Sequence, residues 1–491
     1  MAVQSQALGN AGPPAMAVPG LWLLVAIHGV ILALRIVGLA ASNAELYFDE
    51  AQYWAWSRTL EFGYFSKPPL LAWIIAASTS VCGDTEFCVR LPSPILHMLT
   101  ALVVFAIASR LFDRAVGFWS SLIYGLIPGV SLSATLMSTD VPLLLFWTLA
   151  MLGLVSHVER PSLAAGAAIG LAMGLGLNAK YAMIYFPLCF AAFAAFSARA
   201  RAAARHPGTA LAVGIAVLMI LPNILWNVWN DFATFEHTRQ NADWGSGFPN
   251  IIGMLEFIGI QAVIMWPAPF VAYLLAVRGG SALPVDARRM MIACSAPVFL
   301  VVIAQALISR AHGNWAATAF PAAVILATAY MIAFDWRGML RTTIALSVVV
   351  LVTLSFYGVL VGTVTTGPLG RQFGKLTGWT DFASGVAAVA SANGLGTVVF
   401  DGRAVTASMT WELRRSGLDV RAYLPAATAP GDHFQQTAPW RPSDPGPVLF
   451  VIGGAAPPPD LAARATLLAT VPAKMDMGRA WGGIATLYRM E

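Results

Sequence analysis

The stretch "YFDEAQYWAWSRTLEFGYFSKPPLLAW" (residues 47–73) directly follows the first long apolar segment of the chain. It places two carboxylates, Asp49 and Glu50, beside a cluster of aromatic residues, and it continues to a single lysine, Lys67, before two prolines. Aromatic rings favour the headgroup level of a bilayer, and the prolines restrict the backbone at the lysine. The stretch therefore predicts a loop at a membrane surface that holds an acid and a cation in defined places.

The composition of the whole chain is that of a membrane protein. Of its 491 residues, 58% are hydrophobic and 11% are charged, whereas soluble proteins carry about 25% charged residues. The net charge of +5 comes without a basic run interleaved with aromatic residues, so we expect no nucleic-acid partner. The first 20 residues lack the basic region of a signal peptide, so we expect the first apolar segment to be a retained span.

Eleven apolar stretches predict a polytopic α-helical membrane protein, because about 20 apolar residues suffice for a helix to cross a bilayer. They lie at 20–41, 92–112, 116–136, 140–157, 162–178, 181–198, 209–229, 251–277, 289–308, 313–333 and 341–363.

The distribution of basic residues assigns a side to each loop. If the tail at 1–19 is cytoplasmic, eleven arginines fall in cytoplasmic loops, as the positive-inside rule requires: Arg110, Arg114, Arg160, Arg199, Arg201, Arg205, Arg278, Arg288, Arg289, Arg337 and Arg341. The outer loops after the second span carry Lys180, Arg239 and Arg310. We therefore expect a multi-pass membrane protein with its N-terminus in the cytoplasm and its first outer loop at 42–91. Lysines on the disfavoured outer side, Lys67 and Lys180, are expected to have specific roles.

The region 364–491 has a different character from the transmembrane domain at 20–363. Short β-like runs, "GTVVFDG", "LDVRAYLP", "GPVLFVIGG" and "IATLYRM", alternate with two helix-like stretches, "AVTASMTWELRRSG" and "DLAARATLLATV". Alternating strands and helices predict a small α/β domain. The topology places this domain in the periplasm.

Two of the four cysteines, Cys82 and Cys88, lie in the first outer loop. An oxidising periplasm would permit a disulfide between them, but two unpaired thiols fit the sequence as well. Cys189 and Cys294 lie in predicted spans and are expected to act as small apolar residues. The cysteine spacing indicates no zinc site.

The acids and the lysine of the first loop suit a group transfer from a lipid phosphate. A carboxylate can accept a proton from an attacking hydroxyl, and a lysine ammonium can neutralise phosphate oxygens as the bond to carbon breaks. The opening stretch therefore suggests a reaction site at the membrane surface.

Five stretches together resemble the polytopic GT-C membrane glycosyltransferases. They are the opening stretch, "GDTEFCVRLPS" (83–93), "STDVPLLLFW" (138–147), "LGLNAKYAMIYF" (175–186) and "HGNWAATAFP" (312–321). The resemblance is to the protein O-mannosyltransferase-like branch that contains lipid A aminoarabinose transferases and rhizobial lipopolysaccharide galacturonosyltransferases. It covers most of residues 20–363 in order and is weaker over the C-terminal domain.

The resemblance implies inverting transfer of a sugar from a polyprenyl phosphate to an acceptor at the outer leaflet. Asp49 matches the family's base or acceptor-orienting acid. Glu50 fills the adjacent acidic position and is expected to be catalytic as well. Lys67 matches a lysine that contacts the donor phosphate. Arg90 and Lys180 are expected to bind the donor phosphate as well, and Asp140 and Tyr53 are expected to line the cavity.

Several of these residues also have a simpler structural interpretation. Asp140 could cap the helix that follows it, Arg90 could be an internal salt-bridge partner, and Lys180 could extend along a span end towards the interface. His312 is expected to be structural rather than a base.

The sequence leaves the sugar and the acceptor open. The acceptor could be lipid A, the lipopolysaccharide core, another envelope glycan or a protein hydroxyl. A lipid or sugar transporter is the alternative from a different class, with His28 and Arg35 as its ionisable residues within a span. No cofactor is expected to be obligatory, although some relatives bind a divalent cation near the first-loop acid.

Overall fold

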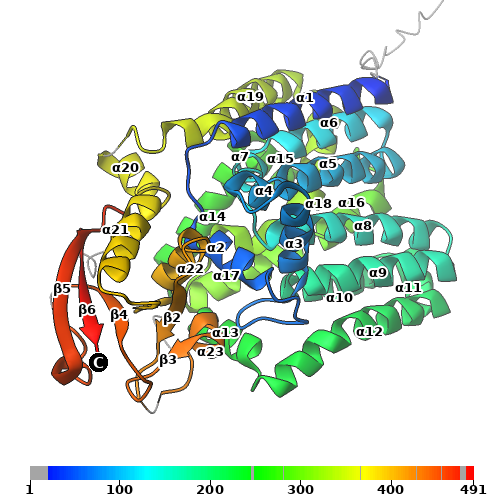
Figure 1. Ribbon diagram of the computed structural model, residues 1–491. Helices are drawn as coiled ribbons and strands as arrows, with labels where there is room; N and C mark the ends of the chain where they lie inside the picture. The colour runs from blue at the N-terminus through cyan, green and yellow to red at the C-terminus, as the bar shows by residue number, and fades with distance from the viewer. Residues whose placement is uncertain are drawn as a thin grey trace, which may run out of the picture.

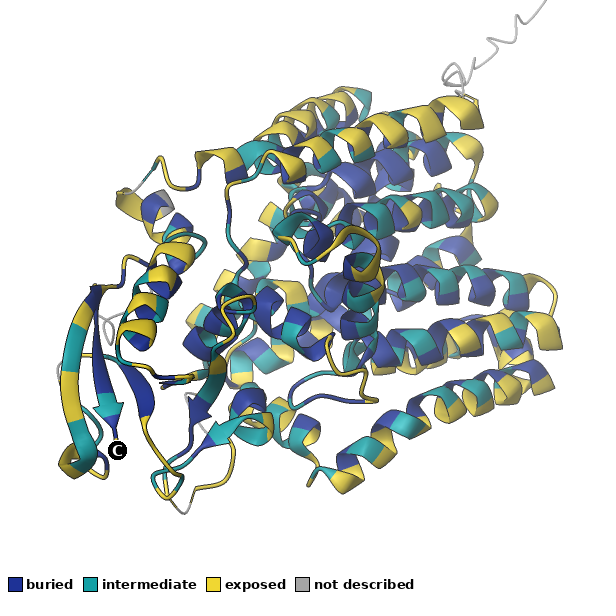
Figure 2. Ribbon diagram, viewed as in Figure 1, coloured by how far each residue is buried: buried dark blue, intermediate teal, exposed yellow. Residues whose placement is uncertain are grey.

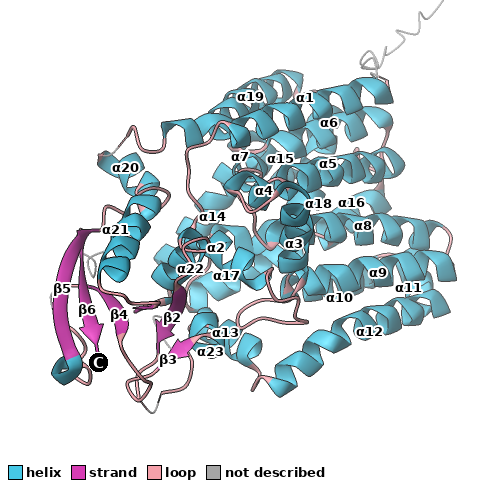
Figure 3. Cartoon of the chain, in the orientation of Figure 1, coloured by secondary structure: helices cyan, strands magenta, loops and turns pink. Residues whose placement is uncertain are grey.

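The computed structural model describes residues 20–244, 248–279, 281–364, 366–426, 428–454, 456–475 and 483–491. The predicted tail at 1–19 therefore lies outside the described residues. The chain forms a helical bundle and a smaller C-terminal region built on a six-stranded sheet (Figure 1). Figure 3 shows that the strands gather in the C-terminal region, which confirms the predicted fold class.

Every predicted span contains helical structure, although several spans are interrupted. The helices of the bundle are α1 (Leu21–Ala40), α5 (Pro92–Leu111), α6 (Arg114–Leu126), α7 (Pro128–Ser133), α8 (Asp140–Glu159), α9 (Leu163–Ala179), η1 (Tyr181–Ile184), α10 (Tyr185–Phe196), α11 (Ala198–Arg205), α12 (Pro207–Trp229), α14 (Ile251–Met265), α15 (Pro267–Arg278), α16 (Val285–Ala293), α17 (Ala296–Ile308), η2 (Gly313–Ala319), α18 (Phe320–Ala333) and α19 (Arg337–Leu360).

Within the described residues, seven helical segments are long and apolar enough to cross a membrane, or eight if α14 and α15 count as one span. The stretch predicted at 251–277 is not one straight helix, because the chain direction bends by 110° between α14 and α15. Trp266 stands between them with φ +72°. Pro267 follows it, and a proline disfavours the α conformation at the preceding residue.

The centre of the bundle is α18. In the apolar segment Gly313–Ala333, which contains this helix, 83% of the most apolar stretch is buried inside the protein. Peripheral helices α1, α12 and α19 carry their exposed residues along outward faces, as Figure 2 shows, and many of those residues are apolar. This is the pattern of a protein that faces lipid. Helices α9 and α12 approach each other so closely that only glycine fits at position 166. A Cβ added to Gly166 would lie 2.0 Å from the carbonyl oxygen of Gly208.

The two ends of the bundle collect different groups of charges. At one end, Arg110 pairs with Glu159, and both line a cavity with Arg199 and Asp286. These residues belong to loops that the alternation of spans assigns to the same side. The opposite end carries the first loop, the acids Asp49 and Asp140, and the C-terminal region.

The first loop is itself folded into three short helices: α2 (Phe48–Trp56), α3 (Leu70–Cys82) and α4 (Glu86–Arg90). A further short helix at this end is α13 (Ala233–Ala242).

The C-terminal region contains α20 (Gly367–Phe373), α21 (Trp379–Ala392), β1 (Thr397–Phe400), α22 (Arg403–Glu412), β2 (Asp419–Tyr423), α23 (His433–Thr437), β3 (Pro439–Trp440), β4 (Val448–Gly453), η3 (Ala462–Arg464), β5 (Ala465–Pro472) and β6 (Ile484–Met490). The strand order is β3-β2-β1-β4-β6-β5, with the first four strands parallel and β6 antiparallel to both β4 and β5.

One predicted helix is wrong. The stretch "DLAARATLLATV" forms the short helix η3 followed by strand β5, which pairs with β6 along its length. Alanine and leucine favour helix locally, but Thr466, Thr470 and Val471 are β-branched, and an available edge of the sheet overrides the local preference.

The C-terminal region docks directly onto the first loop, and Figure 1 shows α22 beside α2. The rings of Trp54 and Trp411 pack edge to face at 4.9 Å, and both belong to one buried apolar cluster. Glu45 accepts hydrogen bonds from the backbone N–H groups of Trp379 and Thr380 at 2.8 and 3.0 Å. Residues about 350 positions apart in the chain thus meet at one surface.

Candidate active site

The first turn of α2 presents its two carboxylates to different surroundings. Glu50 is buried and accepts hydrogen bonds from Arg90 Nη2 at 2.7 Å, the Met137 backbone N–H at 3.0 Å and the Tyr47 backbone N–H at 3.2 Å. Arg90 is equally buried and donates its other N–H groups to the carbonyl oxygens of Ala44 and Glu45, both at 2.8 Å. Both side chains are therefore fully occupied by each other and by the backbone.

Asp49, by contrast, keeps one oxygen available. Its Oδ1 accepts a hydrogen bond from Arg403 Nη1 at 3.0 Å, and the pair is about one-third exposed. No other hydrogen bond to the Asp49 carboxylate occurs within the part of the chain that the structure describes. A carboxylate oxygen that is partly open and unpartnered can accept a proton from a bound hydroxyl.

Lys67 places an unpaired ammonium next to these acids. The backbone holds it in a tight bridge, with N–H to carbonyl hydrogen bonds in both directions between Tyr64 and Lys67 at 3.1 and 3.3 Å. Among the described residues, its ammonium forms no hydrogen bond or ion pair. Burial, followed by the positive charge of Lys180, lowers its pKa from 10.5 to about 8, while Asp49 and Asp140 act in the opposite direction. Such a cation is poised for an anionic ligand.

Asp140 and Lys180 form a second charged group at the same end of the bundle. Lys180 Nζ donates to Asp140 Oδ1 at 2.7 Å, and Asn314 Nδ2 donates to Asp140 Oδ2 at 2.7 Å. The three side chains come from the start of α8, the end of α9 and the start of η2. The Lys180 charge is thus balanced within the protein, unlike that of Lys67.

Tyr53 lies buried between the two charged groups. Burial and the charge of Asp49 raise its pKa well above the ordinary value, and both Arg403 and Asp140 also influence it. Its expected role in lining the site stays a prediction.

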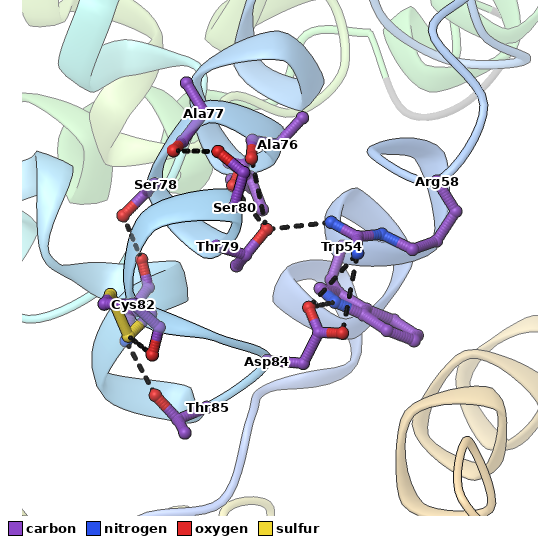
Figure 4. The surroundings of a disulfide bond; sticks show 12 residues. Trp54, Arg58, Ala76, Ala77, Ser78, Thr79, Ser80, Cys82, Asp84 and Thr85 are labelled. Atoms are coloured by element: carbon purple, nitrogen blue, oxygen red, sulfur yellow. Dashed lines mark hydrogen bonds and ion pairs between the residues drawn. A yellow bond between two sulfur atoms is a disulfide. The ribbon is translucent and has the colours of Figure 1, made fainter.

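A disulfide joins Cys82 and Cys88 and closes the turn that carries Asp84 (Figure 4). Asp84 accepts a hydrogen bond from Trp54 Nε1 at 2.7 Å and pairs with Arg58 at 3.2 Å. The closed turn therefore anchors α2, the helix that carries Asp49.

The structure brings most of the sequence-predicted residues to one end of the bundle, but in separate pairings. Lys67 lies within the electrostatic influence of Asp49, Asp140 and Lys180. Glu50, on the same helix as Asp49, forms a separate buried ion pair with Arg90.

Three residues at the site were missed or left without a role by the sequence prediction: Arg403, His237 and Asn314. Arg403 comes from the C-terminal region and contacts Asp49 across 354 positions. His237 lies on α13, and burial together with Lys67 and Arg403 lowers its pKa to about 4. The sequence held a signal for Arg403, because ligands of α/β sheets bind beyond the carboxyl ends of parallel strands and Arg403 closely follows β1.

Among the described residues, no three or more histidine, cysteine, aspartate or glutamate side chains form a group that could hold a metal ion.

The chain is similar to known membrane sugar transferases. A family model described as dolichyl-phosphate-mannose-protein mannosyltransferase matches residues 66–226. The lipid A galacturonosyltransferase RgtD of Rhizobium johnstonii is 32% identical over 426 residues, which cover 86% of this chain and 89% of that protein. The undecaprenyl phosphate-α-4-amino-4-deoxy-L-arabinose arabinosyl transferase 1 of Pseudomonas fluorescens is 29% identical over 235 residues, covering 44% of this chain and 42% of that protein.

The fold is also found among solved structures. ArnT from Cupriavidus metallidurans bound to undecaprenyl phosphate superposes with a TM-score of 0.64 and 16% identity, covering 95% of this chain and 97% of that one.

Proposed function

The chain belongs to the family of GT-C membrane glycosyltransferases that includes the lipid A galacturonosyltransferases, and we propose that it transfers a uronic acid from a polyprenyl phosphate to lipid A. The observation that carries the proposal is that one end of the bundle holds both a carboxylate with one free oxygen, Asp49, and an ammonium without a partner among the described residues, Lys67. The donor and the acceptor class are those in the names of the relatives.

In the proposed reaction, the free oxygen of Asp49 accepts the proton of an acceptor hydroxyl. The acceptor oxygen forms a bond to the anomeric carbon as the bond from that carbon to the phosphate oxygen breaks. The configuration inverts, and the polyprenyl phosphate leaves with the bonding electron pair. Lys67 stabilises the phosphate oxygens on which that charge develops.

We assign Glu50 and Arg90 to positioning in place of the catalytic role and the phosphate contact that the sequence suggested. All of their charged groups are occupied, so neither can bind substrate without breaking a buried ion pair. Their pairing fixes the first turn of α2 against Met137 and thereby fixes Asp49. Lys180, balanced by Asp140, is assigned to the wall of the site together with Asn314 and Tyr53.

The proposed orientation places this site, and the C-terminal region beside it, on the periplasmic side of the bacterial inner membrane. It rests on the concentration of arginines in the loops at the opposite end of the bundle. We propose no obligatory metal, because Lys67 can meet the leaving phosphate. Transfer that survives a strong chelator supports this, and transfer that requires added divalent cation contradicts it.

The test is deletion of the gene, followed by mass spectrometry of lipid A, lipopolysaccharide core, other envelope glycans and periplasmic proteins. We expect lipid A to lose one uronosyl residue and the other fractions to keep their masses. Loss of a sugar from proteins alone would favour a protein O-glycosyltransferase instead. Unchanged glycans together with a transport defect would overturn the enzyme assignment in favour of a transporter.

A further inference from the structure

The guanidinium of Arg403 is only partly used by the protein. Its Nη1 donates to Asp49 Oδ1 and to Gln52 Oε1, both at 3.0 Å. The Nε–H and the two Nη2–H groups have no hydrogen-bond partner among the described residues. The side chain is 36% exposed, so these three donors can be reached by a ligand.

Arg403 is nevertheless held firmly in place. Its guanidinium carbon lies 5.0 Å from the centre of the Phe48 ring, which supports one face of the cation. The helix that carries it, α22, is fixed to α2 by the ring contact between Trp54 and Trp411 and by a hydrogen bond from Trp411 Nε1 to Glu86 at 3.2 Å. A preorganised guanidinium loses little conformational entropy when it binds an anion.

The topology of the sheet places Arg403 where α/β sheets bind ligands. Strand β1 has β2 on one side and β4 on the other, both parallel to it, so the strand order reverses at β1. Ligands of open α/β sheets bind beyond the carboxyl ends of strands at this point. Arg403 begins the helix that follows β1.

The acids near Arg403 do not occupy its free donors. Asp432 accepts hydrogen bonds from the backbone N–H groups of Phe434 and Gln435 at 2.8 and 3.0 Å and so caps α23. Within the described parts of the chain, neither Asp432 nor Asp401 hydrogen-bonds to Arg403.

From these observations, and resting on the proposed function, we propose that the C-terminal region completes the active site through Arg403. One edge of the guanidinium orients Asp49, and its three free N–H groups bind an anionic group of a substrate. That group is either the carboxylate of the transferred uronic acid or a phosphate of the acceptor lipid, since each presents two anionic oxygens that a guanidinium can bind with two parallel hydrogen bonds. Arg403 is therefore a positioning residue for Asp49 and a specificity-determining residue for charge.

The test compares wild type, Arg403→Ala and Arg403→Lys as full-length protein in lipid nanodiscs. Two matched pairs of substrates separate the two sources of charge: a polyprenyl-phosphate galacturonate against its neutral galactose counterpart, and phosphorylated lipid A against dephosphorylated lipid A. KM and kcat are measured for each, and an inhibition constant replaces KM where a neutral compound is not turned over. Arg421→Ala serves as the control, because Arg421 lies in the same region and pairs with Asp419 at an exposed site.

We expect Arg403→Ala to raise KM about 10- to 100-fold for the charged member of one pair, with less than a threefold change for its neutral member. The pair that shows this difference identifies the source of the anion. Arg403→Lys should restore part of the affinity, because lysine supplies the charge without the paired geometry. Arg421→Ala should behave as wild type.

Loss of the orienting contact to Asp49 should lower kcat for all substrates alike. An equal rise in KM for the charged and neutral members of both pairs, or no rise in KM for any substrate, would overturn the inference. Thermal unfolding of Arg403→Ala within a few degrees of wild type excludes global misfolding as the cause of a loss. Failure of the wild type to transfer sugar from either donor would instead refute the proposed function.

Discussion

Replacing Lys67 with alanine should reduce use of the donor far more than use of the acceptor. Burial lowers the pKa of the free Lys67 ammonium from 10.5 to about 8. Since one pKa unit corresponds to about 1.4 kcal/mol, holding the unpaired cation in the site costs roughly 3 kcal/mol. A donor phosphate that pairs with the ammonium offsets this cost, so Lys67→Ala should lower kcat/KM for the donor by about 100-fold. KM for the acceptor should stay within about threefold.

The same cation predicts a pH profile. Because its pKa is lowered in the folded protein, the ammonium is present below about pH 8 and is lost as the pH rises through that value. The sugar-linked donor phosphate is a diester whose single charge does not titrate in this range. Wild-type kcat/KM for the donor should therefore be flat below pH 7 and fall about tenfold per unit well above pH 8. Lys67→Arg should remove the fall, since arginine stays charged.

The assay is the initial rate of transfer in lipid nanodiscs, measured across this range at limiting donor. Lys474→Ala is the matched control, because Lys474 is a highly exposed lysine of the C-terminal region. A donor kcat/KM for Lys67→Ala within threefold of wild type, or the same fall above pH 8 in that variant, would refute the assignment of Lys67 to the donor phosphate.

Three further changes test other parts of the site. Asp49→Asn should lower kcat for a hydroxyl acceptor by about 100- to 10,000-fold at saturating substrates, whereas considerable residual activity would indicate an already ionised phosphate acceptor and a positioning role. Glu50→Gln should leave Arg90 buried without its counter-charge and destabilise the fold by about 3–5 kcal/mol; an unchanged unfolding temperature in detergent would contradict the positioning role. Cys82→Ser should lower the free energy of unfolding by about 2 kcal/mol, because the disulfide closes a short loop between residues six positions apart. Wild type treated with reductant should show the same decrease in unfolding temperature, and no decrease in either sample would contradict a stabilising disulfide.

The membrane fold could be predicted because its signals are local. An apolar run of about 20 residues indicates a span wherever it occurs, and the arginines of the intervening loops indicate which spans share a side. The first loop was also predictable in part, since the prolines after Lys67 and the aromatic residues around Asp49 are neighbours in the chain.

What the sequence did not reveal depends on contacts between distant segments. Glu50 and Asp49 are adjacent and chemically alike, and their surroundings differ only in the folded protein, where Arg90 approaches one and Arg403 approaches the other. The sequence of β5 favours a helix locally, and the segment becomes a strand because it pairs with the edge of β6. The apolar pattern alone does not reveal the bend at Trp266, because the apolar run continues through both helices; Pro267 was its local signal.

The most direct test of the central claim is reconstitution of the purified chain with a polyprenyl-phosphate galacturonate and lipid A, read by mass spectrometry. We expect lipid A heavier by one uronosyl residue, an equal amount of released polyprenyl phosphate, and rates of formation of both products at least about 100-fold lower with Asp49→Asn. The absence of modified lipid A with wild-type protein, or release of the sugar as the free acid alone, would contradict it.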